Sequence, residues 1–185
     1  MKFAVLLLVF LCSYASPVAA KRKAKGPTLA ETTDYIVQIL NVDGHTWSPG
    51  ASIPGLVTSS STTLSNARAS GCLISYDVGD ELSGVTEKIG FWKSVTTYSV
   101  VLDLQSTVAK SVWAGNGGVS VRLSSPINLI KHTKDENGRT SERTEQVTEL
   151  HFILQSSDSA ERLGNALNYA IGLCGGGKVD PFKPR

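Results

Sequence analysis

From Gly71 onward, apolar and polar residues alternate with the period of two that is typical of half-buried β-strands. Turn signals separate the stretches at short intervals, and Asn137-Gly138 predicts a tight turn within a charged hairpin tip, 131–146. Strands at this spacing with one apolar face indicate an antiparallel meander. The residues predicted to face the core are Cys72, Ile74 and Tyr76; Tyr98, Val100, Leu102 and Leu104; Val119, Val121 and Leu123; and Leu150, Phe152 and Leu154.

Helical periodicity flanks this meander on both sides. Thr28 and Glu31 have the spacing of a capping box, which predicts a helix that continues to Leu40. A second helix is expected to begin with Ser157 or Asp158 as its cap and to end before three consecutive glycines. Its apolar stripe comprises Ala160, Leu163, Leu167, Ala170, Ile171 and Cys174.

Residues 41–70, between the first helix and the meander, show no clear period. They contain a run of five hydroxyl residues, 59–63, and two Pro-Gly turn signals. We therefore expect a long Ser/Thr-rich loop over 41–70 that holds one short strand around Val57.

The order of helix, antiparallel strands and helix predicts a single α+β domain over 28–177, with 178–185 as a tail. A strongly twisted meander has open ends, and a helix with an apolar stripe can pack on the sheet or plug one of those ends. We expect a half-barrel of the pleckstrin-homology-like (PH-like) type.

The first twenty residues have the pattern of a secretory signal peptide. A short positive region at Lys2 precedes an apolar run that ends at Leu11, and Val18-Ala19-Ala20 resembles a cleavage site. The apolar run is too short to span a bilayer, which favours cleavage over a membrane anchor. We expect an exported protein, periplasmic or secreted, although the basic residues after the run oppose export.

Composition excludes several classes of protein. The chain has 185 residues, of which 41% are hydrophobic and 18% charged, and its formal net charge is +2. These values exclude wholesale disorder and a strongly basic nucleic-acid binder, and three cysteines exclude a disulfide scaffold. The positive charge gathers in an arm, 21–27, that is either a solvated terminus or a weak contact with a membrane surface through Lys21, Arg22, Lys23 and Lys25.

Residues that could carry chemistry are few and scattered. His45, His132 and His151 have no metal-ligand spacing, and there is no C-x-x-C, nucleophile-elbow or phosphate-loop motif. The acidic residues near one turn are too few for a calcium loop: Asp77, Asp80 and Glu81. We expect no catalytic site, cofactor or metal. A hydrolase remains the alternative, and it requires His45 or His132 to meet a serine and a carboxylate in space.

Two segments carry longer motifs. Thr28 to Ile36 reads T-L-A-E-T-T-D-Y-I, and Arg162 to Gly176 reads R-L-G-N-A-L-N-Y-A-I-G-L-C-G-G. They resemble the opening and closing helices of a group of uncharacterised, often exported bacterial proteins. The resemblance implies an architecture and assigns no catalytic residue, and the Ser/Thr-rich segment before Gly71 departs from the pattern.

These observations favour an exported, non-catalytic binding domain whose ligand is a protein, a peptide or a lipid head group. A structural subunit of an envelope assembly is a further alternative. Trp47 and Trp92 are candidate interaction anchors, although core packing is a more common use of tryptophan. Cys72 and Cys174 are both predicted to point into the core, where they form either a disulfide or two buried free thiols.

Overall fold

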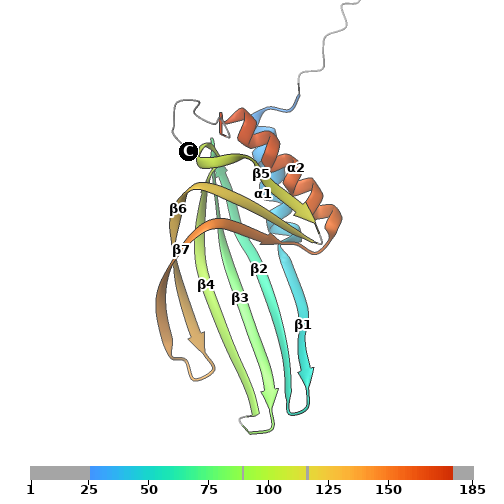
Figure 1. The fold of residues 1–185 in the computed structure, drawn as a ribbon, viewed down its shortest axis with the longest axis vertical. Helices are drawn as coiled ribbons and strands as arrows, with labels where there is room; N and C mark the ends of the chain where they lie inside the picture. The colour runs from blue at the N-terminus through green and yellow to red at the C-terminus, as the bar shows by residue number, and fades with distance from the viewer. Residues whose placement is uncertain (1–25, 89, 116, 177–185) are drawn as a thin grey trace, which may run out of the picture.

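The computed structural model describes residues 26–88, 90–115 and 117–176. The predicted signal peptide, most of the basic arm and the tail lie outside these ranges. The described residues form two α-helices, a short 3-10 helix (Leu104–Ser106) and one antiparallel sheet of seven strands (Figure 1). In chain order the other elements are α1 (Leu29–Asp43), β1 (His45–Ile53), β2 (Leu56–Ser70), β3 (Leu73–Thr86), β4 (Gly90–Asp103), β5 (Thr107–Gly115), β6 (Gly118–Asp135), β7 (Thr140–Ile153) and α2 (Ser157–Leu173).

The sheet curls because β6 changes its neighbour along its length. The strand order is β1-β2-β3-β4-β6-β5, and β7 also pairs with β6. The first half of β6 pairs with β5, whereas only its last residues, 132–135, pair with β4. Between these halves the register with β7 shifts, from Arg122 to Ile127. The sheet forms a half-barrel, which confirms the predicted α+β class.

The core follows the predicted alternation. Of the residues predicted to face inward, Ile74, Val100 and Phe152 are almost completely buried, and Tyr98 and Cys72 pack against the core from its margin. The rings of Tyr76 and Phe152 are 5.2 Å apart, between centroids. Burial raises the pKa of the Tyr76 phenol, so this group stays neutral and acts as core.

The capping box of α1 is confirmed, whereas the cap of α2 is Ser156 and not Ser157 or Asp158 as predicted. Thr28 Oγ1 accepts from the Glu31 amide at 3.3 Å, and the Thr28 amide donates to Glu31 Oε2 at 2.7 Å. Ser156 caps α2, because its backbone is still extended and its hydroxyl accepts from the Ser159 amide at 3.0 Å. Helix α1 continues three residues beyond Leu40, to Asp43.

The expected loop over 41–70 is wrong, because this segment forms β1 and the 15-residue β2. Strand β2 lies between β1 and β3; its first half, 56–63, pairs with β1, and nearly its whole length pairs with β3. Its hydroxyl residues face both sides of the sheet, so the segment lacks apolar alternation although its backbone groups are paired. Within β2 only Leu64 and Ala67 are part of the buried core.

The helices cover one end of the sheet, and strands β1 to β4 project beyond them (Figure 1). A disulfide joins Cys72, in the β2–β3 turn, to Cys174, the C-cap of α2, with 5.8 Å between the Cα atoms. It therefore fixes α2 to the covered end of the sheet. Neither helix in the described part of the chain is long and apolar enough to cross a bilayer.

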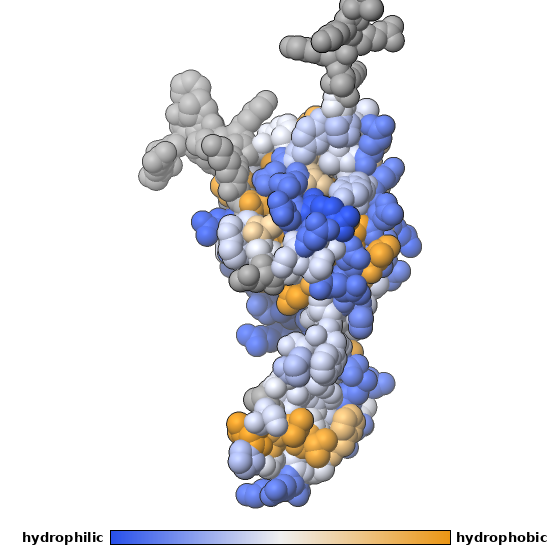
Figure 2. All heavy atoms as spheres, turned by 90° about the vertical axis from the view of Figure 1, so that its right-hand side faces the viewer, coloured by the Kyte–Doolittle hydropathy of each residue, from blue (hydrophilic) through white to orange (hydrophobic). Residues whose placement is uncertain are grey.

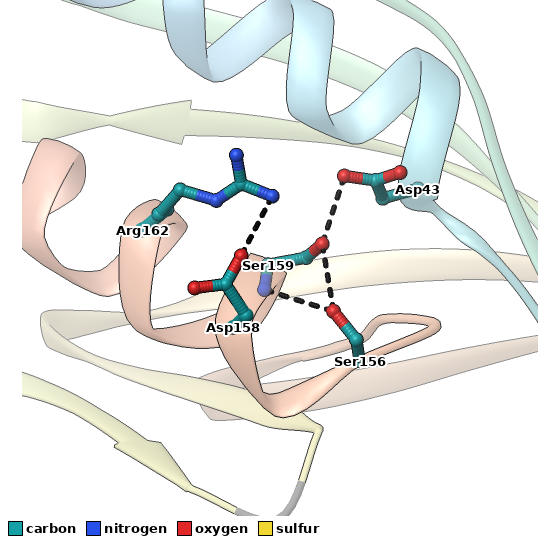
Figure 3. A network of polar contacts seen from close by, with 5 residues as sticks. All are labelled: Asp43, Ser156, Asp158, Ser159 and Arg162. Carbon is teal, nitrogen blue, oxygen red and sulfur yellow. Dashed lines mark hydrogen bonds and ion pairs between the residues drawn. The ribbon is translucent and has the colours of Figure 1, made fainter.

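A small polar network joins the end of α1 to the start of α2 (Figure 3). The buried Ser159 hydroxyl donates to Asp43 Oδ2 at 2.9 Å and accepts from Ser156 Oγ at 3.0 Å. The Gln155 amide donates to the Asp43 carbonyl at 3.1 Å. The backbone and the side chain of Asp43 therefore both bind the segment where α2 begins. Arg162 pairs with Asp158 one turn later, at 3.0 Å.

We expect Ser159→Ala to lower the free energy of unfolding by about 1–2 kcal/mol, because it leaves the Asp43 carboxylate without its partner in a half-buried place. The measurement is urea unfolding followed by circular dichroism. Ser157→Ala is the matched control, since Ser157 is exposed and makes no side-chain hydrogen bond within the described residues. Equal stability of the two variants would contradict the role of this network.

Candidate functional site

The projecting end of the sheet carries an apolar row on the face that points away from the helices. Val57 lies opposite Val85 in the β2–β3 register, and Val85 lies opposite Phe91 in the β3–β4 register. Their exposed fractions are 54%, 51% and 62%. We call these three residues the distal row. Figure 2, which faces the right-hand side of Figure 1, shows apolar atoms gathered near this free end.

Hairpin geometry places the distal row next to two turns. Strands β1 and β2 are joined at Gly55, and β3 and β4 are joined shortly before β4 begins at Gly90, each glycine having a φ of +80°. The residue before the first turn, Ile53, is also apolar and 57% exposed, but it pairs with Leu56 and therefore faces the other side of the sheet. Contiguous apolar side chains left in water at the free end of a sheet are typical of an interaction surface.

A belt of hydroxyl side chains borders the distal row on the same face of the sheet. Ser59 and Ser83 lie one row above it and share a hydrogen bond of 2.9 Å. Further along the same face, Thr63 Oγ1 is 2.8 Å from Nδ1 of His45. The buried core lies on the opposite face of the sheet, so the distal row is a separate surface and not an edge of the core.

The charges around the distal row balance each other. Lys93 Nζ is 2.7 Å from Glu81 Oε2 on the same face, and both side chains are about 40% exposed. Glu87 and Lys88 add one charge of each sign at the β3–β4 turn. This end of the sheet therefore lacks the basic cluster that favours an anionic membrane surface.

The two predicted tryptophan anchors lie on opposite faces of the sheet. Trp47 is 65% exposed on the edge strand β1, on the same face as the distal row. Trp92 is half-buried on the other face, where its ring lies over Gly84. Sequence reasoning missed the distal row itself, although the position of Val57, Val85 and Phe91 beside turn signals was a usable clue.

The histidines do not assemble a hydrolytic site among the described residues. His132 Nδ1 is 3.6 Å from Glu142, His45 contacts Thr63, and His151 Nδ1 is 2.8 Å from Ser120 Oγ. None of the three contacts both a serine and a carboxylate. The Ser120–His151 pair is solvent-exposed.

The acidic residues near one turn also have separate partners. Asp77 accepts from Ser99 at 2.6 Å and from Asn66 at 2.8 Å, and these hydrogen bonds hold the pKa of its carboxyl below the usual value. Asp80, on the other face, accepts from Thr62 at 2.8 Å, and Glu81 pairs with Lys93. Within the described ranges, no group of three or more potential ligands is placed to hold a metal ion.

A shallow concavity of about 670 Å³ lies on the same face as the distal row, nearer the helical end. It forms where β4 leaves β6, because the two strands pair only over four residues of β4, 94–97, and then diverge. Most of its lining residues have polar side chains, and they come from four strands: Thr63, Ser65, Asp77, Val78, Gly79, Thr97, Tyr98, Ser99, Asn128, Ile130 and His132.

Comparison with family models, with curated proteins and with solved structures finds no match to this chain.

Proposed function

We propose that this protein is an exported, non-catalytic binding domain that docks a protein or peptide through the distal row. The observation that supports docking is the alignment of Val57, Val85 and Phe91 across three strands, each more than half exposed. Export is proposed from the signal-like residues 1–20, which lie outside the described part of the chain.

A protein partner suits this surface better than a lipid head group does. A flat apolar row on a sheet can pack against an apolar face of another protein, with side chains of the two surfaces interdigitating. Binding to anionic lipid draws on excess positive charge, and the surroundings of the row carry balanced charges. A structural subunit of an envelope assembly would use the same kind of apolar contact with another protein, but the contact would be permanent.

The proposal is tested by placing a photo-crosslinking amino acid at position 91 and illuminating the protein in its native compartment. We expect a discrete protein adduct whose yield falls about tenfold when Val57 and Val85 are both replaced by serine, since each lost apolar contact weakens docking. The matched control position is Val101, which is 56% exposed on the same strand and face but lies outside the row.

Three results would contradict the proposal. One is equal adduct formation at positions 91 and 101, which would indicate random collisions. Another is an adduct to lipid alone, and the third is an adduct that the double serine variant leaves unchanged. Circular dichroism of the variants checks that each of them remains folded.

A further inference from the structure

The concavity between β4 and β6 is a second candidate site, separate from the distal row. We infer that it binds a neutral saccharide. Most of its lining side chains come from one face of β2, β3, β4 and β6, and the core-side residues Val78 and Tyr98 complete the lining. The frame of the sheet therefore fixes their relative positions. A volume of about 670 Å³ lies within the range of about 300–1,000 Å³ found for small-molecule sites.

Several lining groups have unused hydrogen-bonding capacity. The Asn128 amide and the hydroxyls of Thr97 and Ser65 make no side-chain hydrogen bond within the described residues. Both oxygens of Asp77 already accept one hydrogen bond each, and each can accept another. The site therefore offers donors and acceptors side by side, which matches a ligand that carries many hydroxyl groups.

The shape and charge of the concavity narrow the class of ligand. Ile130 is 50% exposed in the lining, so a ligand with an apolar ring face as well as hydroxyls fits better than a purely polar one. The Asp77 carboxylate opposes an anionic ligand. His132, the one basic side chain in the lining, is already close to Glu142.

Gly79 lines the concavity, and its replacement by a larger residue is the most direct test of ligand binding there. A Cβ built at Gly79 meets no atom within 4 Å, and its partners in the register are Thr63 and Thr97 on this same face. Gly79→Val therefore places its Cβ in open space within the concavity, and a β-branched residue suits a strand. The fold should be kept while the space for a ligand is lost.

The experiment is an NMR titration of the folded protein with a panel of neutral trisaccharides of glucose and of N-acetylglucosamine. For at least one of them we expect saturable amide shifts concentrated at residues 77–79, 97–99 and 128–132. Gly79→Val and Asn128→Ala should each lower its affinity by about tenfold or more. Ser61→Val, on the same face but outside the lining, should bind as the parent does.

The proposal is overturned if no trisaccharide of the panel produces saturable shifts at millimolar concentration, or if the shifts lie elsewhere. It is also overturned if both lining variants bind within about twofold of the parent. An inorganic phosphate titration serves as the anionic comparison, and stronger shifts with phosphate than with any saccharide would reject a neutral ligand. The distal row lies outside the lining, so these outcomes are independent of docking there.

Discussion

Leu167→Ala is expected to lower the free energy of unfolding by about 2–5 kcal/mol, a large part of the roughly 5–15 kcal/mol typical of a domain. Leu167 is 1% exposed and belongs to the stripe by which α2 packs against the sheet. Truncation removes buried apolar contacts and leaves a cavity between helix and sheet. Urea unfolding monitored by far-ultraviolet circular dichroism gives the value.

The neighbouring variant Asn168→Ala is the matched control, because Asn168 is exposed on the same helix. Its side chain makes no hydrogen bond to the described residues, and alanine has a higher helix propensity than asparagine. We expect a change within about 0.5 kcal/mol of the parent value. Similar small losses in both variants would mean that α2 contributes little to the stability of the sheet.

Removal of the disulfide is expected to have an effect of similar size. The bond connects residues 102 positions apart, and the chain-entropy estimate for a loop of about 100 residues is about 4.7 kcal/mol, with about 2–4 kcal/mol being typical. The double variant Cys72→Ala/Cys174→Ala should lose a free energy of unfolding in this range. Thermal and urea unfolding of parent and variant measure the loss.

Two further measurements show whether the loss comes from the bond itself. A reducing agent should destabilise the parent and leave the double variant unchanged. Protein that begins at Lys21 should have no reactive thiol when it is denatured without reductant. Two reactive thiols per chain would show that Cys72 and Cys174 are free.

The strands with a buried apolar face were predictable, and β2 was not. Around Ile74, Val100 and Phe152, apolar and polar residues alternate because one side of the sheet is buried. The sequence pattern there therefore agrees with the structure. In β2 the run 59–63 lies beyond the core, where neither face is buried deeply enough to select apolar residues. Its strand character comes from pairing with β1 and β3, and a single sequence does not reveal such long-range pairing.

The candidate sites depend on the same long-range pairing. Val57, Val85 and Phe91 are far apart in the sequence and become neighbours only through the registers of three strands. Trp47 was identified because its residue type suggested an anchor, whereas valines carry no such signal. The concavity was hidden for a related reason, since Asn128 and Asp77 line it together only because strand pairing places β3, β4 and β6 side by side.

The placement of both helices and the disulfide at one end of the sheet implies a gradient of local stability along the strands. At the covered end, opening a backbone hydrogen bond exposes buried side chains such as Leu102, so amide exchange there should require global unfolding. At the free end, around Val85, the side chains are already exposed, so opening a backbone hydrogen bond there exposes little additional apolar surface. Amides of that end should exchange through local fluctuations, which would allow the free end to adjust to a partner while the covered end keeps its structure.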